Sequence, residues 1–157
     1  DYIMMTKHRD FNVDIPEKLE KILRDVNRLS KEIKVVLPIH PRTKKRIQEF
    51  GFENLISDIM LIEPIDYLQL MGLTEYCHKV ITDSGGYQKE AYFAGKRACI
   101  IMPDTGWREL TDSGWNVLTE EDKIYDNIIN MKQVEYIENI YGNGKASEKI
   151  VSILRQC

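Results

Sequence analysis

Short apolar runs alternate along this chain with longer stretches in which apolar residues recur every three or four positions. The first pattern is typical of buried strands, and the second is typical of the helices that cover them. The alternation predicts strands at residues 2–6, 34–39, 59–62, 79–82 and 98–102, and a further extended segment at 115–118. It predicts helices at residues 41–50, 66–76, 87–94, 108–112, 121–132 and 145–156.

One more helix is predicted after the first strand. Asp14 and Pro16 are start signals, and Glu17 stands three residues after Asp14, as in a capping box. Apolar residues then recur at helical spacing in one stripe, which comprises Leu19, Ile22, Leu23, Val26 and Leu29. Because an amphipathic helix buries such a stripe, we expect this face to form part of the core.

The predicted strands are apolar on both faces, which is typical of a parallel sheet covered by helices on each side. The sequence therefore predicts an α/β fold with a doubly wound parallel sheet. Its length of 157 residues fits one domain, residues 1–157. Because the chain opens directly on a strand without an initiator methionine, we expect it to be a piece of a longer protein.

The composition narrows the class of protein. Apolar residues make up 43% of the chain and the net charge is only −3, which excludes disorder and argues against a nucleic-acid partner. No apolar run approaches the roughly 20 residues that span a bilayer, so no membrane association is expected. Cys77, Cys99 and Cys157 form no Cys-x-x-Cys pair, which fits a reducing cytoplasm, with buried thiols and one tail residue.

Several candidate ligand-binding residues lie just after the predicted strands. Ligands of open parallel sheets bind beyond the carboxyl ends of the strands. His8 and Arg9 follow the first strand, His40 follows the second, and Ser84-Gly-Gly follows the fourth. Polar residues are also common in ordinary loops, but the clustering of these residues favours one binding site at the carboxyl ends of the strands.

The Ser84-Gly85-Gly86 turn is the strongest local signal. A strand, this turn and a helix start bring free backbone N–H groups and the positive end of a helix dipole to one point, which suits a phosphate or diphosphate. Glycine lets the backbone approach the ligand closely. Glu90 lies one helical turn further on, where its carboxylate could accept hydrogen bonds from a ribose. The alternative is a helix cap in an ordinary strand–helix connection.

Other residues carry weaker signals. The chain contains neither Gly-x-x-x-x-Gly-Lys-Ser/Thr nor Gly-x-Gly-x-x-Gly, which disfavours kinases and dehydrogenases. No paired histidine and carboxylate motif resembles a metal site, so neither a metal nor a cofactor is expected. His8 could act as an acid, a base or a diphosphate donor, because imidazole titrates near neutrality. Trp107 could stack on a ligand, whereas Trp115 is expected in the core.

Several motifs, in order and in register, resemble those of the non-hydrolysing UDP-N-acetylglucosamine 2-epimerases. They are Thr6-Lys-His8-Arg9 with Asn12-Val-Asp14, His40-Pro41-Arg42-Thr43, Pro64-Ile-Asp66-Tyr67, Thr82-Asp-Ser84-Gly85-Gly86-x-Gln88-x-Glu90-Ala91, and Tyr141-Gly-Asn-Gly-Lys-Ala-Ser147. The resemblance implies two Rossmann-like domains that face a cleft, as in the B-type glycosyltransferases. It identifies this chain as the carboxyl-terminal, UDP-binding domain, with the amino-terminal domain missing and a cytoplasmic homodimer as the full-length protein.

The resemblance also implies roles for individual residues. His8 would contact the diphosphate or assist catalysis, and Arg9 and Trp107 would contact the substrate. His40 would support the floor of the cleft. The remaining expected contacts are Ser84, Gly85 and Gly86 to phosphate oxygens, Glu90 to the ribose, and Ile65 and Leu70 to the uracil.

The implied reaction interconverts UDP-GlcNAc and UDP-ManNAc by anti elimination and re-addition of UDP, without a cofactor. Phe11, Gly106 and Trp107 depart from the usual family residues, which leaves open a modified UDP-N-acetylhexosamine as substrate. The alternatives are a hydrolysing epimerase or glycosyltransferase of the same architecture, and a noncatalytic UDP-binding module. We expect the acid and base carboxylates on the amino-terminal domain, so this chain alone should not turn over.

Overall fold

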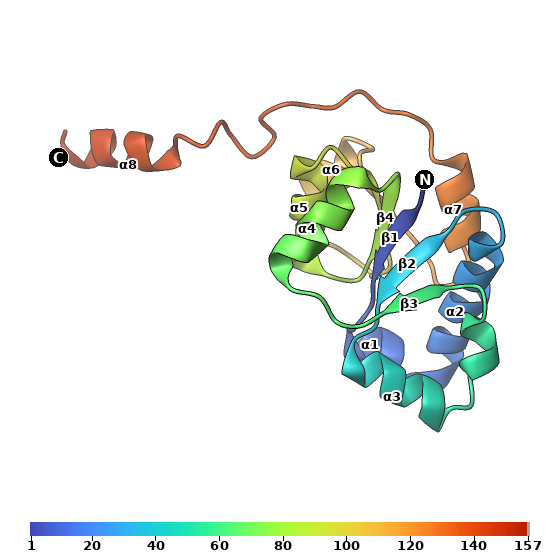
Figure 1. Ribbon diagram of the computed structural model, residues 1–157. Coiled ribbons are helices and arrows are strands. Elements are labelled where there is room, and N and C mark those ends of the chain that lie inside the picture. Colours follow the sequence, from blue (N-terminus) through green and yellow to red (C-terminus); the bar gives the residue numbers. More distant parts are fainter. Residues whose placement is uncertain (157) are drawn as a thin grey trace.

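Short runs of branched and sulfur-containing apolar residues pair into one six-stranded parallel sheet in the computed structural model, which describes residues 1–156 (Figure 1). Cys157, the expected tail cysteine, lies outside the described residues. The strands are β1 (Ile3–Thr6), β2 (Val35–Pro38), β3 (Met60–Ile62), β4 (Lys79–Thr82), β5 (Ala98–Ile100) and β6 (Val117–Leu118). Their order across the sheet is β3-β2-β1-β4-β5-β6. The predicted parallel, doubly wound sheet is therefore confirmed.

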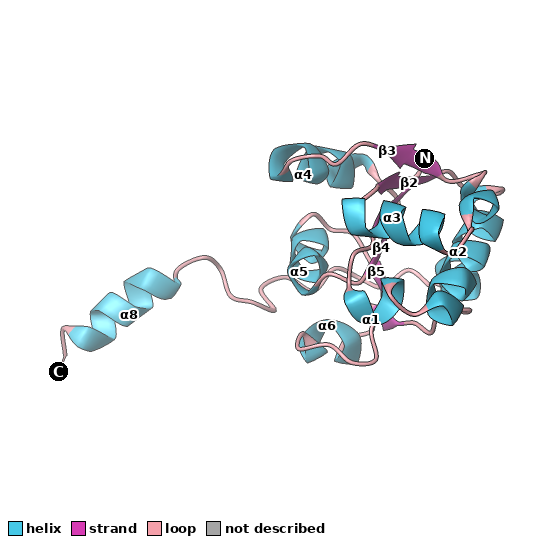
Figure 2. Cartoon of the chain, turned by 90° about the horizontal axis from the view of Figure 1, so that it is seen from below, coloured by secondary structure: helices cyan, strands magenta, loops and turns pink. Residues whose placement is uncertain are grey.

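Helices cover both faces of this sheet. They are α1 (Asp10–Val13), α2 (Pro16–Ser30), α3 (Pro41–Glu49), α4 (Tyr67–Tyr76), α5 (Gly85–Phe93), α6 (Arg108–Asp112), α7 (Ile124–Asn130) and α8 (Ala146–Leu154), with a 3₁₀ turn at Glu53–Ile56. Helices α2 and α7 lie on one side, and α4, α5 and α6 lie on the other (Figures 1 and 2). The short α1 and the 3₁₀ turn were not predicted, because neither is long enough to show a helical period.

The predicted capping box at Asp14 is wrong. Ile15 is the residue that precedes α2, and no side chain caps this end of the helix. The carboxylate of Asp14 instead accepts hydrogen bonds from Arg42 and Arg46 of α3. Two guanidinium groups compete better for a carboxylate than a single amide does, since charge-assisted hydrogen bonds are the stronger ones.

Two hydrophobic layers enclose the sheet because successive strand residues point to opposite faces. On β1, Ile3 and Met5 pack with Ile22 of α2 and Ile128 of α7. Met4, between them, packs on the opposite face with Tyr87 of α5. The expected apolar stripe of α2 is fully buried, and Cys77 and Cys99 are buried free thiols as expected.

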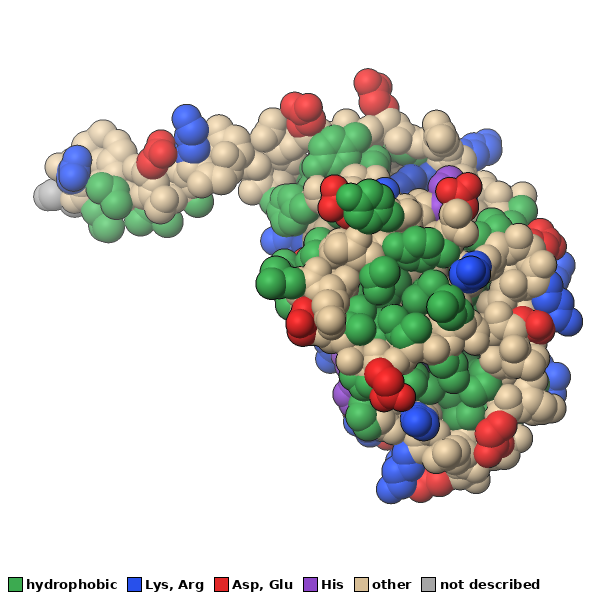
Figure 3. Space-filling view, in the orientation of Figure 1, with side chains coloured by type: hydrophobic (Ala, Val, Ile, Leu, Met, Phe, Trp, Pro, Cys, Tyr) green, Lys and Arg blue, Asp and Glu red, His purple; other side chains and the backbone are tan. Residues whose placement is uncertain are grey.

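The last part of the chain leaves this core. Residues 131–145 run mostly without regular structure to α8, which projects away from the rest of the chain (Figure 1). Ile150, Val151 and Leu154 of α8 are exposed. Apolar side chains also gather on the face shown in Figure 3, and Leu61 of the edge strand β3 and Leu68 of α4 are exposed. No helix within residues 1–156 is long and apolar enough to cross a membrane.

Adjacent isoleucines on α7 test the layer assignment. Ile128 is fully buried and Ile129 is 41% exposed. We expect Ile128→Ala to lower the free energy of unfolding by about 2–4 kcal/mol, because it opens a cavity under the sheet. Ile129→Ala, the matched control, should cost less than about 1 kcal/mol. Urea denaturation of both variants measures the difference, and equal losses would contradict the packing of α7 against the sheet.

Candidate functional site

The strand order creates a crevice between β1 and β4. The chain connects outward from β1 to β2 and β3 on one side, and from β4 to β5 and β6 on the other. The loops that follow β1 and β4 therefore diverge, and this switch point is where open α/β sheets bind ligands. His8 follows β1 and Ser84 follows β4, so two predicted site residues face the same crevice.

A cavity of about 250 Å³ lies at this point, and we call it the switch-point cavity. Its lining comprises Thr6, Lys7, His8, Pro38, His40, Pro64, Ile65, Leu70, Ser84, Tyr87 and Glu90. Six predicted site residues thus come together here from separate parts of the sequence: His8, His40, Ile65, Leu70, Ser84 and Glu90. The cavity joins charged or polar groups at the ends of β1 and β4 to apolar side chains from α4 and the loop before it.

The amino end of α5 is the part of the site whose geometry suits an anion. Ser84 is the N-cap, and its Oγ accepts a hydrogen bond from the backbone N–H of Tyr87 at 3.4 Å. The helix begins at Gly85 rather than at residue 87 as predicted, so Gly85 and Gly86 form its first turn. Backbone N–H groups in a first turn have no acceptor within their own helix. Unlike the N–H of Tyr87, those of Gly85 and Gly86 are available to a ligand that approaches along the helix axis.

Open space surrounds both glycines. A Cβ atom built at Gly85 or at Gly86 would meet no other heavy atom within 4 Å, and neither residue has a positive φ. The fold of this chain therefore does not itself require glycine at these two positions. Space left free in front of helix amides is what a ligand in contact with the backbone needs.

Asp83 connects the loops after β1 and β4. Its fully buried carboxylate accepts hydrogen bonds from the backbone N–H groups of His8 and Arg9, each at 3.1 Å, and from the amide of Asn12 at 3.3 Å. The ammonium of Lys7, also fully buried, lies 3.4 Å from the same carboxylate. These contacts fix the backbone of the loop that carries His8 relative to Ser84.

Burial changes the protonation of this network. It lowers the pKa of Lys7 to about 8, although the Asp83 carboxylate opposes part of that change. Burial also lowers the pKa of His8, again against the influence of Asp83. The imidazole of His8 therefore loses its proton more readily than an exposed imidazole does.

The two histidines have different partners. Nδ1 of His8 lies 3.5 Å from a carboxylate oxygen of Asp83. This contact favours the tautomer with the proton on Nδ1, in which Nε2 is unprotonated. Nδ1 of His40 accepts a hydrogen bond from the backbone N–H of Arg42 at the start of α3. The two ring centroids are 5.8 Å apart. His8 is thus held by a carboxylate, whereas His40 also serves as a helix cap.

Four predicted ligand contacts are not among the residues that line the cavity: Arg9, Gly85, Gly86 and Trp107. The side chain of Arg9 is exposed, and only its backbone N–H joins the Asp83 network. Trp107 lies behind the first turn of α5, where its indole N–H donates a hydrogen bond to the carbonyl oxygen of Gly85 at 2.6 Å. Trp107 therefore contacts the backbone at the start of α5, and its expected stacking on a ligand stays a prediction.

Four residues of the site received no role from the sequence: Lys7, Asn12, Asp83 and Tyr87. A lysine directly after an apolar strand and an aspartate directly after another were visible signals of a buried pair. The sequence could not show that β1 and β4 are neighbours, and this pairing is what brings Lys7 to Asp83. Tyr87 is fixed by a hydrogen bond between its hydroxyl and that of Thr74.

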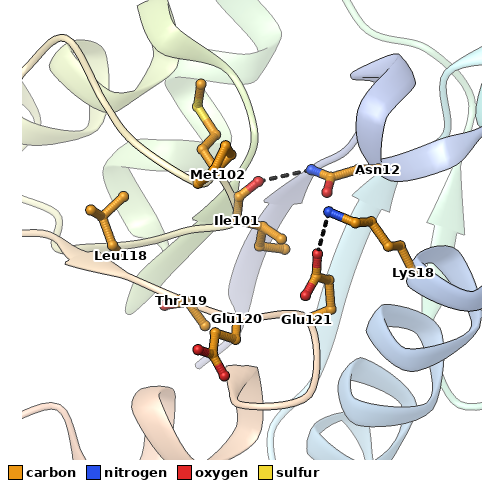
Figure 4. A pocket seen from close by; sticks show the side chains of 9 residues that line it. Asn12, Lys18, Ile101, Met102, Leu118, Thr119, Glu120 and Glu121 are labelled. Carbon is orange, nitrogen blue, oxygen red and sulfur yellow. Dashed lines mark hydrogen bonds and ion pairs between the residues drawn. The ribbon is translucent and has the colours of Figure 1, made fainter. Parts of the chain in front are cut away.

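A second cavity, of about 410 Å³, lies beside the ends of β5 and β6 (Figure 4). The ion pair between Lys18 and Glu121, at 2.8 Å, closes one side, and the amide of Asn12 donates to the carbonyl oxygen of Ile101. Its one basic lining residue, Lys18, is already paired with Glu121, and its other charged lining residue, Glu120, is acidic. We therefore assign ligand binding to the smaller switch-point cavity.

A family model described as UDP-N-acetylglucosamine 2-epimerase matches residues 1–155. A UDP-N-acetylglucosamine 2-epimerase homolog of Methanococcus maripaludis is 37% identical, and the match covers 98% of this chain and 44% of the relative. A UDP-2,3-diacetamido-2,3-dideoxy-D-glucuronate 2-epimerase of Pseudomonas aeruginosa is also 37% identical, with the same two coverages. The chain therefore spans less than half the length of these curated relatives.

A solved structure gives the same result. The UDP-GlcNAc 2-epimerase of Methanocaldococcus jannaschii, crystallised in complex with UDP-GlcNAc and UDP, matches with a TM-score of 0.86 and 34% identity. The match covers 100% of this chain and 46% of that chain. It confirms the predicted Rossmann-like domain as the carboxyl-terminal half of a two-domain, glycosyltransferase-B-like fold.

The Lys7–Asp83 pair gives a prediction about pH. Because the pKa of Lys7 is about 8 in the folded protein and 10.5 when exposed, the folded state binds fewer protons than the unfolded state between these values. The free energy of unfolding should therefore rise with pH across this window, by about 3 kcal/mol relative to a Lys7→Met variant.

Urea denaturation of both proteins between pH 8 and pH 10.5 measures this difference. Tyrosine and surface lysine ionisation affects both proteins alike and cancels in the comparison. A difference that stays constant with pH would show that Lys7 titrates as an exposed lysine does.

Proposed function

Because the chain belongs to the UDP-N-acetylglucosamine 2-epimerase family, we propose that it is the UDP-binding half of a two-domain UDP-N-acetylhexosamine 2-epimerase. One observation carries the proposal most directly. The first turn of α5 has Ser84 as its cap and contains two unobstructed glycines, and Ser84, Tyr87 and Glu90 line the same cavity as His8. A diphosphate in that cavity would contact helix amides on one side and an imidazole on the other.

The proposed binding mode uses the whole cavity. The diphosphate accepts hydrogen bonds from Ser84 and from the amides of Gly85 and Gly86, where the helix dipole also favours negative charge. The carboxylate of Glu90, one turn along α5, accepts hydrogen bonds from the ribose hydroxyl groups. Ile65 and Leu70 provide the apolar contact for the uracil ring, and both line the cavity.

The proposed reaction removes the proton from C2 of the sugar and breaks the bond between C1 and the diphosphate oxygen, on opposite faces of the ring. The products are UDP and a 2-acetamidoglucal. UDP then adds back to C1, and C2 is protonated on its other face, which gives the epimer. Because UDP leaves as an anion, donors that hold the diphosphate also lower the barrier to its departure.

His8 fits a role at the diphosphate. Its pKa is lowered by burial in the ligand-free protein, and a diphosphate beside the ring would favour the imidazolium by its charge. Protonated His8 would then stabilise the negative charge that develops on the leaving oxygen. Asp83 would hold the ring in place through Nδ1.

The remaining parts of the proposal concern the complete protein. We assign the acid and base carboxylates that act at C2 to the amino-terminal domain, which would face the switch-point cavity across a cleft. The complete protein would be a cytoplasmic homodimer that supplies precursors for a surface polysaccharide. Arg9 would contact the substrate from the rim of the cleft.

The sugar is either N-acetylglucosamine or a modified N-acetylhexosamine. The second candidate rests on the Pseudomonas aeruginosa relative, which is named for a diacetamido-glucuronate and is as similar to this chain as the Methanococcus maripaludis homolog. Incubating the complete protein with each UDP-sugar distinguishes them. Epimerisation conserves the UDP-sugar, whereas accumulation of free UDP would indicate a hydrolysing epimerase or a glycosyltransferase, and no conversion would indicate a noncatalytic module.

A side chain at the glycine pair tests the diphosphate site. We expect Gly85→Val to weaken UDP binding by at least about 100-fold, because the branched side chain fills the space in front of the helix amides. Gly72→Val, on α4, is the matched control, since a Cβ there also meets nothing within 4 Å. Isothermal titration calorimetry with UDP measures both variants. Wild-type affinity in the Gly85 variant would place the diphosphate elsewhere.

Replacing the histidine tests its catalytic role. His8→Ala should lower kcat of the complete enzyme by roughly 100-fold or more, as loss of an acid–base or charge-stabilising group does. His78→Ala is the control, because His78 is exposed and precedes the amino end of β4, whereas the site lies beyond the carboxyl ends of the strands. An unchanged kcat for the first variant would remove His8 from the reaction.

A further inference from the structure

The loop between β5 and α6 makes a specific contact with the anion site. Trp107, the last residue before α6, donates its indole N–H to the carbonyl oxygen of Gly85 at 2.6 Å. Gly85 is the first residue of α5. A side chain 22 positions further along the chain is therefore bonded to the backbone of the turn that would hold the diphosphate.

The chemistry of the peptide bond makes this contact relevant to binding. The carbonyl of Gly85 and the N–H of Gly86 belong to one planar trans peptide, so they point in opposite directions. A donor on the carbonyl oxygen fixes the plane and so aims the N–H of Gly86 out of the helix end. It also polarises the peptide, which makes that N–H a stronger donor to an anion.

Further contacts hold the indole in this position. The backbone N–H of Trp107 donates to the hydroxyl of Thr105, and that hydroxyl donates to the side-chain oxygen of Gln88 on α5. Thr105 and Gln88 are both buried. The ammonium of Lys89 lies 4.3 Å from the centre of the Trp107 ring and 4.2 Å from that of Tyr141. The indole is thus held by hydrogen bonds on one side and by a cation on the other.

We propose that Trp107 is a positioning residue for the diphosphate: its indole N–H orients and polarises the Gly85–Gly86 peptide that donates to the phosphate oxygens. This inference rests on the proposed UDP site at the start of α5. It assigns Trp107 an action through the backbone and no contact with the ligand. Such an action affects the phosphate part of the ligand and leaves the nucleoside part unchanged.

Trp107→Phe tests the inference, because it keeps an aromatic ring beside Lys89 but removes the indole N–H, and the same change at a second tryptophan controls for the smaller ring. Trp115→Phe is the matched control. The indole N–H of Trp115 also donates to a backbone carbonyl, that of Lys96, but this lies beyond the other end of α5. Calorimetric titration of the complete protein with UDP and with uridine, which lacks phosphate, gives four affinities to compare with the unsubstituted protein.

We expect Trp107→Phe to weaken UDP binding roughly three- to tenfold, as loss of one hydrogen bond does, and to leave uridine binding unchanged. Trp115→Phe should leave both affinities unchanged, even where thermal denaturation shows it to be less stable. Equal UDP affinity in the Trp107 variant and the unsubstituted protein would overturn the inference.

Two further outcomes would also overturn it. Weaker binding of UDP and uridine alike, or the same loss in both tryptophan variants, would show a general loosening of α5. If the unsubstituted protein bound uridine but gained no affinity from the phosphates of UDP, the proposed function would fail first. A failure of the inference alone therefore differs from a failure of the proposed function.

Discussion

The buried carboxylate of Asp83 holds together the two loops that form the site. It follows β4 and accepts hydrogen bonds from the backbone after β1, where His8 begins its loop. Without it, two backbone amides and the ammonium of Lys7 would lose their common partner in a buried place, which is among the costlier changes a protein interior can undergo. The same residue precedes Ser84, so one side chain sets the separation between the imidazole and the amino end of α5.

The elements of the fold could be predicted from the sequence because each strand is apolar on both faces and each long helix has a visible period. The strand order could not, since the apolar pattern of β1 is the same whether its neighbour is β4 or another strand. This limit also hid the pairing of Lys7 with Asp83. The predicted capping box failed for a related reason: the arginines that take Asp14 come from α3, which the local sequence does not bring near.

The candidate site was predictable where loops follow strands, and less so where side chains act through other groups. His8, Ser84 and Glu90 line one cavity because strand ends in a parallel sheet meet at one edge. Trp107 looked like a stacking residue, since a half-exposed tryptophan near a ligand usually offers its ring. The sequence did not show that its polar edge is bonded as well, because that bond depends on the carbonyl of Gly85, 22 residues away, lying within reach of the indole N–H.

The first turn of α5, next to the switch-point cavity, contains main-chain amides without an acceptor in their own helix, and this has a consequence for how such proteins diverge. A peptide N–H is present whatever side chain it carries, so mutation can alter most of the surface around the turn without erasing its donors. The constraint falls on shape, in the form of two residues that must stay small. A domain built this way can keep a phosphate-binding site through extensive sequence change, while the side chains around that site change to suit other sugars.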